Sequence, residues 1–215
     1  MKGTIREWLT CGIVTSAILG ISGCSSLGSY PPLPQSTPKE PVTTNPAAYN
    51  YLVGPGDELN IFVWGNPEVS QSVTVRPDGK VTTPLVEDVV VSGLTPTQVA
   101  RKIEEKLSVY IKEPIVTVIA EGFVGPYSEQ VRIIGEASKP QALPYREDMT
   151  LLDVVIAVGG ITEFADGNNA SVVRIVDGQQ RQFSIRIDDL ISDGDISANV
   201  DILPGDILII PEAWF

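Results

Sequence analysis

The chain contains no histidine, and it has only two cysteines and two methionines among its 215 residues. Without histidine, the Ser-His-Asp and Cys-His nucleophile systems are excluded and the commonest metal ligand is missing. Zinc and copper sites of the ordinary type are therefore not expected. We predict that the chain holds no metal and no cofactor and has no catalytic residue.

Basic residues are also scarce. The chain has 15 lysines and arginines against 27 aspartates and glutamates, which gives a formal net charge of −12. Such a chain repels a phosphate backbone, so nucleic acid is not an expected partner. A pair of carboxylates could cleave glycosidic bonds, but the spacing singles out no two of the many acids. We therefore expect a protein that is not an enzyme.

Long apolar runs are missing too. The apolar stretch from Trp8 to Leu19 has about half of the roughly 20 residues that a membrane-spanning helix needs. It follows Lys2 and Arg6 and is followed by small residues, which is typical of a secretory signal peptide. We assign the signal peptide to residues 1–23.

The run Ile21-Ser22-Gly23-Cys24 resembles the lipobox of bacterial lipoproteins. The resemblance implies that Cys24 is acylated and becomes the first residue of the mature chain. A plain signal peptide that contains a cysteine is the alternative. Residue 25 is Ser, whereas lipoproteins kept in the inner membrane usually have Asp there. The resemblance therefore implies a lipid anchor in the cell outer membrane, with the protein facing the periplasm.

Residues 24–48 are predicted to form a tether between the lipid and the folded part. Six prolines lie there among serine, threonine and asparagine, with few apolar side chains. Such a segment cannot bury a core, so we expect it to be extended or disordered.

Residues 49–122 are predicted to form a compact α+β unit. Thr95 is expected to cap a helix, with Pro96 at the first helical position and Gln98 completing a capping box. Apolar residues at 99, 103 and 107 give this helix one buried stripe. The turn signal Asp78-Gly79 lies between two apolar stretches. Strands are expected at 59–64, 73–75, 81–86 and 115–120.

Residues 128–211 are predicted to form a second α+β unit. Thr150 is expected to cap a short helix, and Gly159-Gly160 to end it as a left-handed cap. Strands at 131–134 and 207–210 lie on either side of a hairpin over 171–187 with an Asp177-Gly178 turn. The predicted fold class is α+β, with two small mixed α/β domains after the tether.

One short pattern occurs twice. Gly54-Pro55-Gly56-Asp57 and Leu203-Pro204-Gly205-Asp206 each precede an apolar stretch. Pro and Gly form a turn, and Asp can accept a backbone N–H where the strand begins. We interpret Asp57 and Asp206 as structural residues, and expect each alanine substitution to cost about 1 kcal/mol or somewhat more.

The same residues carry a family resemblance. The stretch from Tyr51 to Leu59, the stretch from Val75 to Val81, the helix after Thr95 and the stretch from Pro114 to Val118 are similar to the polysaccharide export domain of outer-membrane polysaccharide exporters. The stretches Val131 to Gly135, Leu151 to Val154, Ala157 to Ile161 and Pro204 to Asp206 resemble the β-grasp SLBB domain of that family. The ending from Ile210 to Phe215 resembles short exporters of exosortase-associated exopolysaccharide loci.

The resemblance implies a homo-oligomeric ring that conducts exopolysaccharide or capsular polysaccharide, aligned with inner-membrane export machinery. Long members of the family cross the outer membrane with a C-terminal amphipathic helix. This sequence stops at Phe215, so we expect a separate outer-membrane β-barrel partner to complete the passage. Trp214 and Phe215 are the candidate contact with it, or else they pack back onto the core. The alternative function is a monomeric periplasmic lipoprotein that binds a soluble ligand or cell-wall glycan.

Two further patterns have a functional and a structural interpretation. Acidic and polar residues alternate from Asp193 to Asp201 like the ligands of a calcium loop, but Ala198 and Pro204 replace the Gly and Glu that an EF-hand needs. We prefer a solvated acidic loop, and Asp188-Asp189 is interpreted as surface charge. Three aromatic residues near predicted strand ends could stack on sugars or belong to the core: Trp64, Tyr127 and Tyr145.

Overall fold

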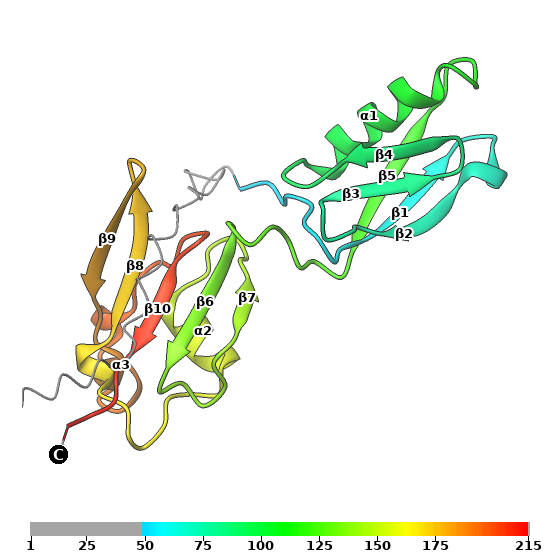
Figure 1. Ribbon diagram of the computed structural model, residues 1–215. Coiled ribbons are helices and arrows are strands. Elements are labelled where there is room, and N and C mark those ends of the chain that lie inside the picture. The colour runs from blue at the N-terminus through cyan, green and yellow to red at the C-terminus, as the bar shows by residue number, and fades with distance from the viewer. Residues whose placement is uncertain (1–48, 215) are drawn as a thin grey trace, which may run out of the picture. The chain divides into compact units, whose positions relative to one another are not determined.

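The computed structural model describes residues 49–214 (Figure 1). The predicted signal peptide, the lipobox with Cys24, the tether and Phe215 lie outside the described residues. Two units of mixed secondary structure follow one another along the chain, and each has its own apolar core. In chain order the elements are β1 (Glu58–Val63), η2 (Pro67–Val69), β2 (Gln71–Thr74), β3 (Lys80–Thr83), β4 (Val86–Val90), α1 (Pro96–Leu107), β5 (Val116–Glu121), β6 (Gln130–Gly135), β7 (Ala142–Pro144), α2 (Leu151–Ala157), η3 (Gly167–Asn169), β8 (Ser171–Val176), β9 (Gln179–Ser184), α3 (Ile187–Ile191), η4 (Ile196–Ala198) and β10 (Ile207–Ile210).

The first unit contains an antiparallel sheet of order β2-β1-β5 and a separate hairpin of β3 and β4. Helix α1 packs against β5 and β4 and buries the stripe Val99, Ile103 and Leu107. Its predicted capping box is confirmed: the Gln98 N–H donates to Thr95 Oγ1 at 3.3 Å, and the Thr95 N–H donates to Gln98 Oε1 at 2.9 Å. The helix therefore begins where its local sequence predicts.

The strand expected at 81–86 is wrong, because two strands, β3 and β4, occupy residues 80–90. The chain reverses at Leu85, whose φ is 67°. A branched residue rarely adopts this conformation, so the sequence carries no turn signal there. The strands on either side of the Asp78-Gly79 turn also have different partners, since β2 pairs with β1 and β3 pairs with β4.

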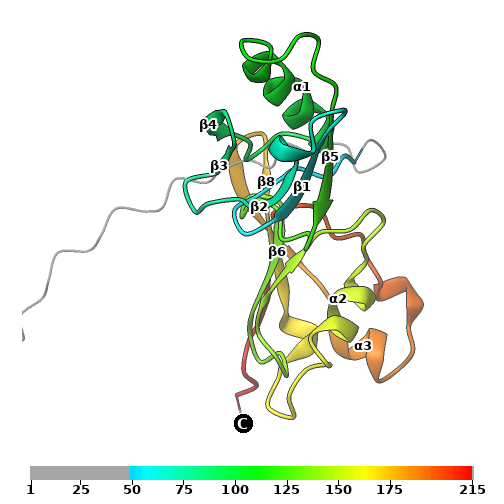
Figure 2. The same cartoon turned by 90° about the vertical axis from the view of Figure 1, so that its right-hand side faces the viewer.

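The second unit has a five-stranded sheet of order β7-β6-β10-β8-β9. Strand β10 is parallel to β6, and the other neighbours are antiparallel. Helices α2 and α3 lie on one side of this sheet (Figure 2), where their buried residues join one core with Val131, Ile133 and Leu208. The hairpin prediction extends too far, because β9 ends at Ser184 and Ile187 begins α3. The predicted α+β class is confirmed.

Candidate functional site

The first Pro-Gly-Asp turn places a carboxylate inside the first unit. Asp57 is fully buried. Its Oδ2 accepts the Gly54 N–H at 2.8 Å and the Tyr51 hydroxyl. Its Oδ1 accepts the N–H groups of Val124 at 2.6 Å and Gly125 at 3.1 Å. Four donors therefore surround this carboxylate, and the last two belong to the segment after β5.

Gly54 is required for this arrangement. A Cβ built on Gly54 would lie 1.9 Å from the carbonyl carbon of Gly125, far closer than any side chain can approach. Because only glycine leaves that space, the backbone at Gly54 and the segment after β5 can meet over the Asp57 carboxylate.

Tyr51 stabilises the same carboxylate from the side. Partial burial raises the pKa of the Tyr51 hydroxyl far above its usual value, and the hydrogen bond to Asp57 is the second largest cause. The Tyr51 ring also meets the Phe123 ring edge to face, with centroids 5.3 Å apart. Tyr51 is therefore a neutral donor that joins the start of the unit to the segment after β5.

The second Pro-Gly-Asp turn repeats the local geometry with a different partner. Asp206 Oδ2 accepts the Leu203 N–H at 2.8 Å, just as Asp57 Oδ2 accepts the Gly54 N–H. In each turn the aspartate N–H also donates to the carbonyl of the residue three positions earlier, at 3.2 Å. Arg174 then donates to Asp206 twice, from Nε at 2.8 Å and from Nη2 at 2.7 Å. In the first unit, the buried Asp57 is thus held by the backbone amides of the segment after β5. In the second unit, the buried Asp206 is held by the bidentate Arg174 guanidinium.

The remaining glycines of the predicted motifs allow backbone conformations or close approaches that other residues rarely permit. Gly79 has a φ of 74°, and a Cβ on it would lie 2.7 Å from Ser92 Cβ. Asp78 beside it pairs with Arg76 on the surface. Gly159 and Gly160 have φ values of 77° and 90°, and the Gly160 N–H donates to the Val155 carbonyl at 2.8 Å at the end of α2. In the two repeated turns, Pro204 and Gly205 are buried, Pro55 is partly buried and Gly56 is exposed.

Oxygen atoms of the acidic loop bond to their own chain. Asp195 Oδ1 accepts the Ser197 N–H at 2.9 Å, and hydrogen bonds from Ser197 lower the pKa of Asp195. Asn199 Oδ1 accepts the Leu152 N–H at 3.0 Å. Within residues 49–214, no three acidic or cysteine side chains gather as metal ligands would. Neighbouring Asp189 is likewise paired, with Arg186 and Asn168.

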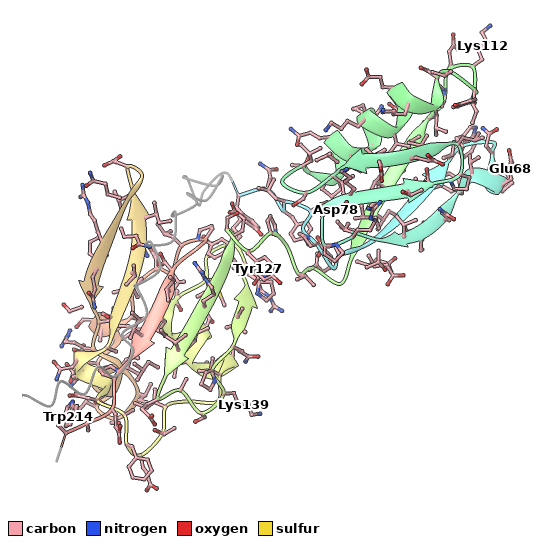
Figure 3. All side chains as sticks on the ribbon, in the orientation of Figure 1. Glu68, Asp78, Lys112, Tyr127, Lys139 and Trp214 are labelled. Atoms are coloured by element: carbon pink, nitrogen blue, oxygen red, sulfur yellow. The ribbon has the colours of Figure 1, made fainter. Side chains whose placement is uncertain are left out.

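The aromatic candidates separate into core and surface. Tyr145 is buried in the second core, whereas Trp64 is exposed. Tyr127 and Trp214 are exposed as well (Figure 3). Trp214 is 100% exposed, so its side chain does not pack back onto the core.

Each sheet has an open face that carries apolar side chains. On the first sheet, the open face is formed by the residues of β1 and β5 that alternate with the buried ones, and by Trp64 and Ile115, which continue the ladder by one pair. Its large apolar members are Phe62, Trp64, Ile115 and Ile119, which are 45%, 69%, 60% and 52% exposed. The rings of Phe62 and Trp64 are in edge contact, with centroids 6.3 Å apart. Polar residues normally occupy the solvent face of an antiparallel sheet, so this open face is suited to contact another molecule.

The second sheet shows the same pattern on the side away from α2. Register places Ile134, Ile207, Ile209 and Val173 on its open face. The sequence reasoning missed both open faces and the Arg174 partner of Asp206. A usable signal was present, because β8 reads Ser-Val-Val-Arg-Ile-Val, and an arginine within an apolar strand predicts a buried acid.

The second unit has a groove of about 480 Å³, which is a candidate ligand site for the alternative binding function. Its lining includes Met149, Ile156, Arg146 and Asp153. Asp153 is already engaged, since it accepts the Thr150 N–H at 2.9 Å in the capping box of α2. Three further charged residues line the groove: Arg146, Glu147 and Asp148.

Among the described residues, every helix is too short or too polar to cross a bilayer.

Comparison with known proteins gives concordant matches to both units. Residues 45–121 match the family described as polysaccharide biosynthesis/export protein, and residues 129–210 match the SLBB domain. The EPS I polysaccharide export outer membrane protein EpsA of Ralstonia nicotianae (strain ATCC BAA-1114 / GMI1000) is 26% identical over 182 residues, which cover 74% of this chain and 46% of that relative. The chain thus matches less than half the length of this curated relative. The SLBB match also agrees with the expected β-grasp-like second unit. With both units matched in the order that the motifs predict, the chain belongs to the polysaccharide biosynthesis/export protein family.

Proposed function

We propose that this protein is an outer-membrane lipoprotein that forms part of an oligomeric conduit for exopolysaccharide or capsular polysaccharide. The observation that carries the proposal is the ordered match of an export domain and an SLBB domain over residues 45–210. The relative that shares these residues is named as a polysaccharide export outer membrane protein. The protein acts as a passive component and not as an enzyme.

In this proposal, residues 1–23 are removed and Cys24 carries lipid at the periplasmic face of the outer membrane. Residues 24–48 are the tether, residues 49–122 the polysaccharide export domain and residues 128–211 the SLBB domain. Several copies assemble as a ring, and inner-membrane export machinery delivers the polymer to it.

The open faces of the two sheets support a role in assembly. Phe62, Trp64, Ile115 and Ile119 expose apolar surface on the first sheet. Contiguous exposed apolar patches are typical of protein contact sites.

Deleting the gene from its host tests the function. We expect polysaccharide to disappear from the medium and to accumulate inside the envelope, and the wild-type gene to restore secretion. Cys24→Ala should fail to restore it, while the matched control Cys11→Ala, which changes a residue of the removed segment, should succeed. Normal secretion by the deletion strain would contradict the export proposal and favour the binding alternative.

A further inference from the structure

Strand β5 is an edge strand that the protein leaves largely unprotected. It lies at one margin of the sheet β2-β1-β5 (Figure 2). The Trp64 N–H donates to the Ile115 carbonyl at 2.9 Å, which sets the alternation of the antiparallel ladder. The backbone groups of Val116, Val118 and Ala120 therefore point away from β1, toward the free edge.

In the part of the chain that the structure describes, side chains cover only the first of these three residues. Val116 donates its N–H to Glu104 Oε1 at 2.9 Å, and its carbonyl accepts from Arg101 Nη2 at 3.4 Å. Within residues 49–214, no partner is found for the outward groups of Val118 and Ala120. The strand also lacks the lysine, proline or bulge that usually blocks an edge. An extended peptide is the ligand that such a row of donors and acceptors fits.

The charges at the end of β5 indicate what kind of strand fits. Glu121 lies directly opposite Glu58 in the ladder, and both are exposed. Like charges in this position destabilise a sheet. Neither carboxylate has an ion-pair partner among the described residues. A basic strand beside β5 would remove this repulsion.

The chain itself carries a matching edge in its second unit. Strand β9 is the outermost strand of the second sheet, is six residues long like β5, and is exposed along its whole length. Its one charged residue is Arg181, whose pairing with Asp177 is long, at 3.8 Å, and largely exposed. The two-residue turn between β8 and β9 makes Val176 and Gln179 a hydrogen-bonded pair, so Gln180, Gln182 and Ser184 point their backbone groups outward.

We propose that β9 of one copy of this chain pairs antiparallel with the free edge of β5 in a second copy. Several registers match the outward groups of the two strands; the one that places Arg181 opposite Glu121 also places Phe183 opposite Ile119. Phe183 and Ile119 are 45% and 52% exposed, so this contact also buries apolar surface. When each copy offers β9 to one neighbour and β5 to another, the interface is heterologous, and its repetition closes a ring or extends a filament.

This inference rests on the proposed homo-oligomer, since it names the surface through which the copies join. Cysteine cross-linking in intact cells tests it on the full, membrane-bound chain. In the proposed register Ile119 and Phe183 form a non-hydrogen-bonded pair, whose Cα atoms lie about 4.5 Å apart, within disulfide reach. The native cysteines, Cys11 and Cys24, are the same in every sample.

After oxidation with diamide, we expect Ile119→Cys/Phe183→Cys to form a ladder of disulfide-linked multimers. Each single variant should form none, and the matched pair Ile119→Cys/Gln182→Cys should form none, because the Gln182 side chain lies on the other face of β9. Dimers from Ile119→Cys alone would overturn the proposal in favour of β5 pairing with β5.

Charge reversal gives a second measurement. In native mass spectrometry of the detergent-extracted protein, Glu121→Arg and Arg181→Glu should each lose the oligomer, and the double variant should regain it. If the wild-type protein is an oligomer but the cysteine pair forms no ladder and charge reversal has no effect, this interface is wrong and the proposed oligomer stands. A wild-type protein that is a monomer both in membranes and in detergent would overturn the oligomer and this interface together.

Discussion

Asp57 is a buried carboxylate, and within residues 49–214 it is surrounded by hydrogen-bond donors and pairs with no basic side chain. We expect Asp57→Asn to lower the free energy of unfolding by about 3 kcal/mol, since hydrogen bonds to a charged group are worth about 1.5–3 kcal/mol and an amide cannot accept from donors on both sides. This is more than the roughly 1 kcal/mol expected from the sequence for a single lost bond.

Urea unfolding of the purified protein measures this change. The matched control is Asp78→Asn, because Asp78 lies on the surface beside Arg76 and exposed ion pairs contribute about 0–1 kcal/mol. Equal stabilities of Asp57→Asn and the wild type would show that the carboxylate is dispensable for the fold.

The raised pKa of Tyr51 predicts that the protein loses stability at high pH. Its pKa is raised in the folded protein by burial and by the hydrogen bond to Asp57. The folded state therefore keeps a proton that the unfolded chain begins to lose near pH 10. This stabilisation is complete below the unfolded pKa and disappears as the pH rises through the folded one.

The variant Tyr51→Phe should accordingly be less stable at pH 7 by about 1.5–3 kcal/mol, and its free energy of unfolding should fall less steeply above pH 10. Tyr49 and Tyr145, whose pKa values are also raised by burial, remain in both proteins and contribute equally. Unfolding curves measured from pH 8 to 12 test the slope. An unchanged slope would mean that Tyr51 titrates alike in both states.

At this scale, the sequence predicted the local part of each site and missed the distant part. The Pro-Gly-Asp pattern predicts an aspartate that accepts a nearby N–H, and the Gly54 and Leu203 amides fulfil that role. The Val124 and Gly125 amides, 67 and 68 residues from Asp57, could not be predicted, because the tertiary fold brings them there.

Among the helices and strands, the helix whose first turn carries a capping motif was predicted best. Helix α1 has its capping box at the residues expected, because the bonds that form it lie within one turn. Strand β7 was missed because it is three residues long and ends in Pro144. Strand β4 was missed because Leu85 and Asp88 adopt positive φ values without being glycine. Such conformations depend on tertiary packing and not on local sequence preference.

The cap of α1 can be tested by substitution. Thr95→Ala removes the oxygen that accepts the Gln98 N–H, so we expect a loss of about 1 kcal/mol in the free energy of unfolding. Thr95→Ser keeps that oxygen and should stay close to the wild type. Thermal unfolding of the three proteins distinguishes them, and equal melting temperatures for Ala and Thr would show that the cap contributes nothing.

For the whole molecule, the order of the motifs indicated the family, whereas the contact surfaces came only from the structure. Apolar residues on both faces of β1 are compatible with a fully buried strand. The register with β5 shows instead that Phe62 and Trp64 lie on an open face. Which face of a sheet remains uncovered depends on where α1 packs, and that is not encoded within the strand.

Lipidation of Cys24 is a prediction about the whole molecule, because it determines where the protein is held. Mass spectrometry of the membrane fraction should find a mature chain that begins at Cys24 with two or three acyl groups. Cys24→Ala should leave an unprocessed or mislocalised precursor, and Cys11→Ala should behave as the wild type. A soluble product that begins at another residue would contradict the anchor.

The contact between Gly54 and Gly125 has a consequence for how the chain acquires its structure. The first unit closes only when residues 124 and 125 reach the Asp57 carboxylate, so a chain that has emerged only as far as Gly122 holds a buried acid with half of its donors missing. The first unit therefore reaches its full stability only when the segment beyond β5 is present. A fragment that stops at Gly122 should unfold at a lower temperature than one that continues through Pro126, and calorimetry of the two fragments would measure the difference.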